Sequence, residues 1–333
     1  MAHRYKIRDI AQQSGLSKAT VDRVLNGRAG VRESTRAEVM QAIADLDKQR
    51  SQLRLNGQRY LIDVVMEAPG RFSDAFRAAV EYELPTFAPA VLRARFHLWE
   101  HGPPARMVET LGRIRASHGV VLKARDEPVV AEAIDALAAS GVPVVTYTTD
   151  VPNSCRCAYV GIDNRAAGVT AAYLVQQWLG PAPSDVLVIL SRNASRGEEE
   201  REAGFRTGLR GSGRDIVSVS DAGGSVNHDL LRLLEERPSL QAVYSIGGGN
   251  AATLAAFERL GLRCRVFVAH DLDADNRRLL RAGRISAVLH NDLCVDARKA
   301  MQLILQARGV LSAEPARPTP VQIVCPHNLP ADR

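Results

Sequence analysis

The sequence predicts an α/β protein, with a short all-α unit at the N-terminus followed by two lobes built on doubly wound parallel sheets. Apolar residues recur at helical spacing in three stretches within the first 48 residues. From residue 61 onward, short apolar runs of strand length alternate with longer helical stretches, the pattern of parallel sheets with crossover helices. About ten such units are too many for one comfortable sheet, so two lobes are expected.

The N-terminal unit is predicted to be a helix-turn-helix arrangement. Ser14-Gly15 ends the first helix, where Gly permits a sharp turn. Ser17 caps the second helix, Asn26-Gly27 ends it, and Ser34 is expected to cap the third. The residues expected on the inward faces are Ile7, Ile10, Ala11, Val21, Val24, Leu25, Val39, Ile43 and Leu46.

The body is predicted to contain nine strands and the helices between them. The strands are expected at 61–66, 91–98, 119–122, 143–148, 186–190, 216–220, 242–246, 266–270 and 287–290. The clearest helices are 129–140, 166–179 and 251–260. The Pro-rich stretch 311–320 is expected to cross between the lobes.

The net positive charge of the chain arises in its N-terminal part. Residues 1–59 hold twelve Lys and Arg against six acidic residues, which accounts for the whole net charge of +6. A basic module on a neutral body indicates a polyanionic partner for that module, although a solubilising charged face would give the same count. Five scattered cysteines favour a reducing, cytoplasmic setting, and Cys155 with Cys157 lacks partners for a metal site. No membrane span, signal peptide, metal or cofactor is expected.

Residues 7–46 carry a long, ordered motif, which includes Asp9-Ile10-Ala11, Gly15-Leu16-Ser17, Ala19-Thr20-Val21, 23–26 (Arg-Val-Leu-Asn) and Thr35-Arg36. This motif resembles the headpiece of the lac repressor family of bacterial transcription regulators. The body resembles the periplasmic sugar-binding-protein fold that this family carries behind its headpiece. The resemblance implies double-stranded operator DNA as one partner and a small sugar-like or polyol effector as another.

A second helix that begins at Ser17 can present its outer side chains to a major groove, where a bidentate contact gives roughly 1–3 kcal/mol of base discrimination. The resemblance implies that Lys18 and Ala19 vary with the operator and that Arg23 contacts a base or a phosphate. Thr20 and Asn26 would bind phosphates. The alternative for Arg23 is a salt bridge to Asp9 or Asp22. The full DNA-contact set expected is Ser17, Lys18, Ala19, Thr20, Arg23, Asn26 and Leu55.

Two positions depart from the family pattern. Asp22 stands where many members have Ser, and a carboxylate there would repel phosphate or accept from a cytosine amino group. The stretch 49–59 is polar and basic, lacks the usual start of the hinge helix, and is expected to be a linker. Leu55 is the first choice and Leu53 the second for a minor-groove wedge; the alternative is that both leucines cover the headpiece or body.

Open α/β sheets bind small molecules at the carboxyl ends of their strands. Polar residues at such ends are Lys123, Asp150, Asn250, Asp271 and Asn291, and Gly247–Asn250 opens a helix after a strand. The resemblance implies sugar contacts for Asp150, Asn250, Asp271 and Asn291, with ring stacking on Phe72 and core packing for Phe76. It also points to an arginine before Gly204-Phe205, for which Arg201 and Arg196 are the candidates. The alternatives are a turn cap for Asp150 and a helix cap for Asp271.

These features predict a headpiece at 1–48, a linker at 49–59 and an effector-binding and dimerisation domain at 60–330. Lobe one is expected at 60–164 and 292–318, and lobe two at 165–291 and 319–328. The predicted function is a repressor, as a homodimer or alternatively a tetramer. The alternative function is a sugar-modifying α/β enzyme fused to a DNA-binding headpiece. The absence of any enzyme motif argues against this alternative. A third interpretation is a pure ligand-binding protein whose basic N-terminus is incidental.

Overall fold

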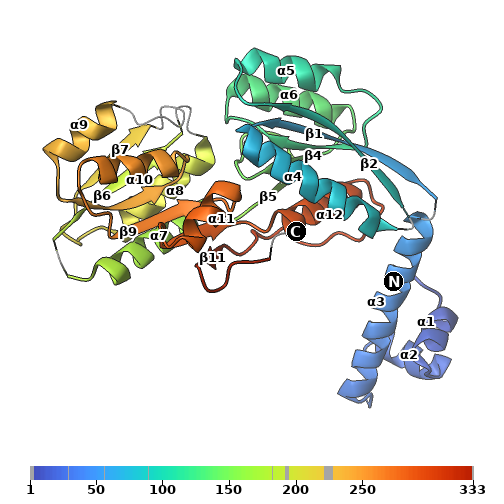
Figure 1. The fold of residues 1–333 in the computed structure, drawn as a ribbon. Helices are drawn as coiled ribbons and strands as arrows, with labels where there is room; N and C mark the ends of the chain where they lie inside the picture. Colours follow the sequence, from blue (N-terminus) through green and yellow to red (C-terminus); the bar gives the residue numbers. More distant parts are fainter. Residues whose placement is uncertain are drawn as a thin grey trace.

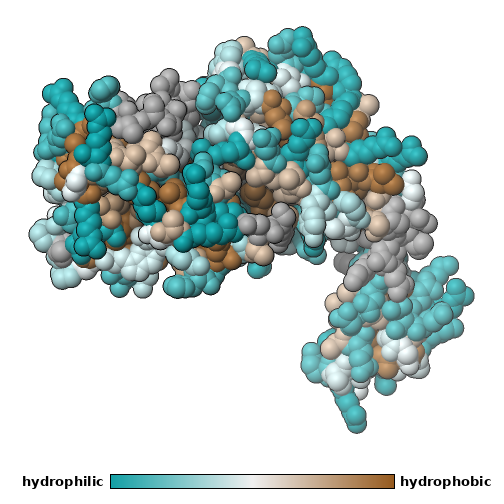
Figure 2. All heavy atoms as spheres, viewed as in Figure 1, coloured by the Kyte–Doolittle hydropathy of each residue, from teal (hydrophilic) through white to brown (hydrophobic). Residues whose placement is uncertain are grey.

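The structure is a computed structural model that describes residues 4–28, 30–55, 57–88, 90–181, 183–191, 195–220 and 228–331, with side chains described outside 48–55. A small helical headpiece hangs from one end of a long helix, and the other end of that helix meets the first of two α/β lobes, which lie side by side (Figure 1). Hydrophilic side chains predominate on the visible face of the headpiece (Figure 2).

The headpiece consists of α1 (Ile7–Ser14), α2 (Lys18–Leu25) and the first half of α3 (Glu33–Leu55). Its core confirms the predicted inward faces, because Ile10, Val21 and Val39 are fully buried and the remaining predicted residues pack with them. Gly15 ends α1 with a φ of 69°, the left-handed conformation that a tight turn between two helices requires. The prediction of Ser34 as a cap is wrong, since α3 already begins at Glu33.

Helix α3 continues through Leu55, so the backbone of residues 49–55, which were expected to belong to a linker, is helical. The physical reason is composition. Residues 48–55 contain only Lys, Gln, Arg, Ser and Leu, mostly good helix formers, and no Gly or Pro interrupts them. Gly57, with a φ of 71°, lies between α3 and β1 (Arg59–Glu67).

Lobe one is a five-stranded parallel sheet in the order β2-β1-β3-β4-β5. One face is covered by α4 (Gly70–Glu83) and α12, and the other by α5 and α6. Its other elements are η1 (Leu84–Phe87), β2 (Val91–Trp99), α5 (Pro104–Arg113), β3 (Gly119–Lys123), α6 (Pro128–Ala139), β4 (Val144–Tyr147), β5 (Ala158–Val160) and α12 (Leu293–Ala307).

Lobe two is a six-stranded sheet in the order β11-β10-β9-β8-β6-β7. Helices α9, α10 and α11 cover one face, and α7 and α8 the other. The elements are α7 (Asn164–Leu179), β6 (Asp185–Leu190), α8 (Arg196–Gly208), β7 (Ile216–Ser220), α9 (His228–Glu236), β8 (Leu240–Ser245), α10 (Asn250–Arg259), β9 (Val266–His270), α11 (Ala274–Arg281), β10 (Ala287–His290) and β11 (Gln322–Val324).

The two-lobed α/β prediction is confirmed, and all nine predicted strands are present, three with the predicted bounds and six with shifted ends. Two strands were missed, β5 and β11, because each has only three residues and carries no recognisable period. Strand β11 also pairs antiparallel to β10, an exception to the expected parallel pairing. The chain leaves α12 in lobe one and reaches β11 in lobe two, so the Pro-rich stretch does cross between the lobes, with Thr319 bridging to Ile162.

Candidate functional site

The first candidate site is the outward face of α2. Ser17 caps the helix by accepting a hydrogen bond from the Thr20 N–H at 3.1 Å, and the two hydroxyls lie 2.8 Å apart. Lys18, Ala19 and Arg23 are exposed. Since the apolar side of α2 is buried against α1 and α3, the packing of the headpiece leaves this polar and basic face turned to solvent.

Arg23 has no acidic side chain within salt-bridge distance among the residues that the structure describes. Of the two acids expected to compete for it, Asp9 lies 3.6 Å from Arg8, and Asp22 lies 3.6 Å from Arg28. The guanidinium of Arg23 can therefore contact DNA without first breaking an ion pair. This arrangement favours DNA contact over the salt-bridge alternative.

Asn26 is held by its own helix. Its side-chain amide donates to the backbone carbonyl of Asp22 at 3.0 Å and to the Asp22 carboxylate at 2.9 Å. Both contacts come from the one nitrogen that could donate to a phosphate, so the expected phosphate contact would require this pair of bonds to break. Leu55 and Leu53 lie outside the described side chains, and the wedge prediction is untested.

The second candidate site is a cleft between the lobes at the carboxyl ends of the strands. It is lined by Pro69, Arg71, Phe72, Lys123, Thr148, Ser191, Ser195, Gly197, Glu198, Arg201, Ile246, Gly247 and Asp271. The structure thus brings together four predicted effector residues, namely Phe72, Lys123, Arg201 and Asp271. Arg71, Glu198 and Thr148 were missed, although Arg71 could have been found as the neighbour of Phe72 after the first strand.

Lys123 at the end of β3 supplies a partly buried cation. Its ammonium nitrogen lies 5.7 Å from the centre of the Phe72 ring. Burial lowers the pKa of Lys123, and the nearby Glu198 and Asp271 carboxylates partly oppose that shift. Among the described residues, no carboxylate lies within salt-bridge distance of this ammonium group. A ligand oxygen would give it the acceptor that the protein does not.

Arg201 enters the cleft from α8. It is 7% exposed, and its Nε donates to the Asn164 side chain at 2.8 Å. Asn164 in turn donates to the backbone carbonyl of Thr148 at 3.0 Å, so a residue at the lobe junction fixes the arginine. No other described residue accepts a hydrogen bond from Arg201, so its terminal nitrogens can donate to a ligand.

Asp271, which follows β9, also lines the cleft, and its backbone conformation is unusual. Its φ is 64°, and Thr148 has a φ of 57°. Of the three non-glycine residues with positive φ in the described part of the chain, these two line the cleft. Such strain is tolerated where the surroundings impose it and is concentrated at functional sites.

Asn250 lies behind the cleft and supports Asp271 indirectly. Its amide donates to Asn276 at 2.6 Å, and Asn276 donates to the backbone carbonyl of Asp271 at 2.7 Å. The predicted cap role of Asp271 is wrong, because Asp273 caps α11 by accepting from the Asn276 N–H. Asp163 caps α7 by accepting a hydrogen bond from the Ala166 N–H.

Three further predicted effector residues are not brought into the cleft. Asp150 accepts hydrogen bonds from the Thr146 hydroxyl and the Val151 N–H, and is paired with Arg156 through both carboxylate oxygens. Asn291 is 3% exposed and lies beside Asp296. Arg196 forms an ion pair across the lobes with Asp126 at 2.9 Å.

The cleft has a cavity volume of about 50 Å³, against roughly 300–1,000 Å³ for typical ligand pockets. Side chains from both lobes hold it closed. On one rim Arg71 contacts Asp273, and on the other Arg196 contacts Asp126, while Gly197 N–H donates to Thr149 at 3.2 Å. A sugar would therefore need the lobes to separate before it could enter.

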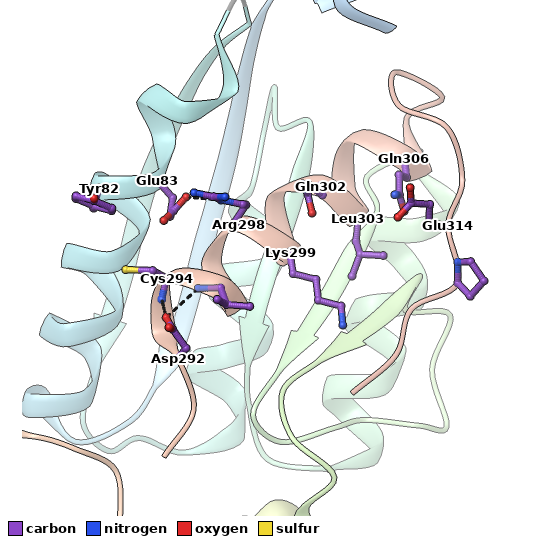
Figure 3. A pocket seen from close by; sticks show the side chains of 12 residues that line it. Tyr82, Glu83, Asp292, Cys294, Arg298, Lys299, Gln302, Leu303, Gln306 and Glu314 are labelled. Atoms are coloured by element: carbon purple, nitrogen blue, oxygen red, sulfur yellow. Dashed lines mark hydrogen bonds and ion pairs between the residues drawn. The ribbon is translucent and has the colours of Figure 1, made fainter. Parts of the chain in front are cut away.

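A larger groove of about 450 Å³ runs between α4 and α12, and none of the predicted effector residues lines it (Figure 3). Glu83 on α4 points to Arg298 on α12 and accepts from its Nε at 2.7 Å, while Asp292 caps α12 (Figure 3). These charged groups already have partners within the chain. The interlobe cleft is the better candidate for an effector site.

Comparisons with known proteins agree with both parts of the architecture. Residues 6–49 match the family "Bacterial regulatory proteins, lacI family", and residues 109–309 match "Periplasmic binding protein domain". A sucrose operon repressor of Vibrio alginolyticus is 46% identical over 39 residues, a match that spans 12% of this chain and 42% of that protein.

Solved structures resemble the body. The glucose-galactose binding protein GanP of Geobacillus stearothermophilus superposes with a TM-score of 0.72 at 18% identity, over 82% of this chain and 100% of GanP. A Bacteroides fragilis protein assigned as a LacI transcriptional regulator gives 0.71 at 13% identity, over 81% and 98%.

A helix-turn-helix headpiece on a two-lobed body with a polar cleft defines the class of DNA-binding transcription regulators. The chain belongs to the periplasmic binding protein domain family and carries a lacI-family headpiece, the architecture of lacI-family regulators. In the described part of the chain, no helix is long and apolar enough to cross a membrane, and no cluster of three His, Cys, Asp or Glu side chains suits a metal ion.

Proposed function

We propose that this regulator is a cytoplasmic repressor whose affinity for its operator is controlled by a sugar or polyol bound between the lobes. The observation that carries the proposal is the cleft, where Lys123, Arg201 and Asp271 meet beside the Phe72 ring. Charged donors and an acceptor around one aromatic face suit a ring that carries many hydroxyls. The sugar-binding relatives named above support this class of ligand. No specific observation favours the fused sugar-modifying enzyme.

The proposed switch couples the cleft to the headpiece. Effector binding changes how the lobes close, shifts a lobe-one dimer face and alters the segment that joins α3 to β1. A coupling free energy of about 1–3 kcal/mol would change operator affinity severalfold to a hundredfold. A homodimer is expected because two-fold operators pair two headpieces about one helical turn apart, with a tetramer as the alternative.

A thermal-shift screen of sugars and polyols tests the effector, since a specific ligand raises the melting temperature by mass action. Any hit is then added to a gel shift with a duplex that the wild-type protein selects from a randomised pool. An inducer releases the duplex and a corepressor tightens it. Arg23→Ala should abolish specific binding and leave the thermal shift intact. Turnover of a sugar by the protein, or specific binding retained by Arg23→Ala, would overturn the proposal.

A further inference from the structure

Asp22 is the residue of the DNA-reading helix that the proposed function does not account for. A carboxylate on this face would ordinarily repel the phosphate backbone, which carries one negative charge per roughly 1.7 Å of duplex. In the structure, however, Asp22 is turned to neighbours in its own chain. One oxygen accepts from Asn26 at 2.9 Å, and the other lies 3.6 Å from the guanidinium of Arg28.

The loop after α2 brings Arg28 back to Asp22. The N–H of Gly27 donates to the carbonyl of Val24 at 3.1 Å, and the N–H of Arg28 donates to the carbonyl of Arg23 at 2.9 Å. Gly27 has a φ of 63°, the left-handed conformation that lets the chain reverse. These hydrogen bonds hold the main chain of Arg28 beside the last turn of α2, and its guanidinium is the part that lies next to Asp22.

The side chains of Arg28 and Asp22 differ in how much of each is exposed to solvent. The side chain of Arg28 is 62% exposed, whereas that of Asp22 is 35% exposed. The cation therefore faces outward and the anion lies beneath it. Because Asn26 has committed its amide nitrogen to Asp22, Arg28 is, beside Arg23, a cation at this end of the helix that can donate to a phosphate.

We propose that Asp22 is a positioning residue, which holds Arg28 over the end of α2 so that its guanidinium contacts a phosphate of the bound duplex. Asp22 itself touches neither base nor phosphate. The inference rests on DNA binding by the headpiece, and it assigns the phosphate contact at the end of α2 to Arg28 in place of Asn26.

The test measures affinity for the duplex selected by the wild-type protein, by fluorescence anisotropy over a series of salt concentrations. The full-length variants are Arg28→Gln, Asp22→Asn and the double variant. Asp22→Asn keeps an oxygen that can accept from Asn26 but removes the charge that holds Arg28. Arg113→Gln, which removes an exposed cation that is also paired with a carboxylate, from α5 of lobe one, is the matched control.

Arg28→Gln should weaken binding and reduce the slope of log K against log salt by about 0.9 for each headpiece bound. Asp22→Asn should weaken binding severalfold, and it should have no further effect once Arg28 is replaced. Tighter binding by Asp22→Asn would show that the carboxylate repels phosphate and overturn the inference. So would an altered base preference in that variant, or an unchanged salt slope in Arg28→Gln. Failure of the wild type to bind any duplex would count against the proposed function instead.

Discussion

The Nε of Arg71, in lobe one, lies 2.9 Å from the carboxylate of Asp273, in lobe two. Arg71 also donates to the carbonyl of Gly247 at 3.5 Å, so one side chain from the start of α4 reaches two segments of the other lobe. With Arg196 and Asp126 on the opposite rim, the lobes are joined on both sides of the cleft.

Replacing Arg71 by Ala should favour the open arrangement of the lobes. The side chain is 44% exposed, so the ion pair contributes on the order of 1 kcal/mol or less. Losing a free energy of that size is enough to raise the population of the open arrangement of the lobes severalfold. Small-angle X-ray scattering without effector should show a larger radius of gyration. Arg77→Ala is the control, because Arg77 pairs with Glu81 within α4. Equal radii for both variants would contradict the prediction.

Asp150→Ala should destabilise lobe one more than it affects the cleft. The carboxylate accepts from the Thr146 hydroxyl at 2.6 Å and is paired with the largely buried Arg156. Losing it should lower the free energy of unfolding by about 1.5–3 kcal/mol, measured by urea denaturation. Asp150→Asn, which keeps one oxygen acceptor, should lose less. A calorimetric titration in which Asp150→Ala loses effector binding without loss of stability would instead restore the direct contact predicted from sequence.

Gly204→Ala should disturb the helix pair that carries Arg201. A Cβ at this position would lie 2.1 Å from the backbone carbonyl oxygen of Arg165, so α7 and α8 would have to move apart. We expect a loss of about 1–3 kcal/mol and a lower melting temperature. Gly112→Ala is the matched control, because nothing lies within 4 Å of its Cβ position in α5. If the two variants melted alike, the close packing of α7 on α8 would be in question.

Stability should depend on Asp296 between about pH 4 and pH 6. This carboxyl group is 0% exposed, and burial raises its pKa from 3.8 to about 6. The folded state then binds more protons than the unfolded state in that window, so this group's contribution falls as pH rises. The loss amounts to about 2–3 kcal/mol above pH 6.

Asp296→Asn should remove this part of the pH dependence and raise the free energy of unfolding at pH 7.5. Urea denaturation of both proteins at pH 4, 5, 6 and 7.5 gives the difference directly. A difference between wild type and variant that stays constant across the series would contradict the raised pKa.

The sequence by itself determined the elements and the headpiece. Apolar residues recur at helical spacing within each headpiece helix, as Val39, Ile43 and Leu46 do, and the apolar runs of the body have strand length, so local periodicity was enough to predict these elements. The headpiece motif is contiguous, which is why its turn at Gly15 and its cap at Ser17 were predicted correctly. Lys123 and Asp271 were predicted from their places at strand ends, because strand ends in α/β folds converge on one edge. Phe72 and Arg201 were predicted from the resemblance to sugar-binding proteins.

Only the tertiary structure decided which of the candidate polar residues face the cleft and which serve neighbours. Asp150 and Asp271 follow strands in the same way, yet Arg156 engages the first and the second remains open to the cleft. The ion pairs Arg71–Asp273 and Asp22–Arg28 form only because the folded chain brings the two residues together and points their side chains at each other. The local sequence determines at which position of a helix or strand a side chain lies. The environment of that side chain is determined by the packing of segments that are distant in sequence.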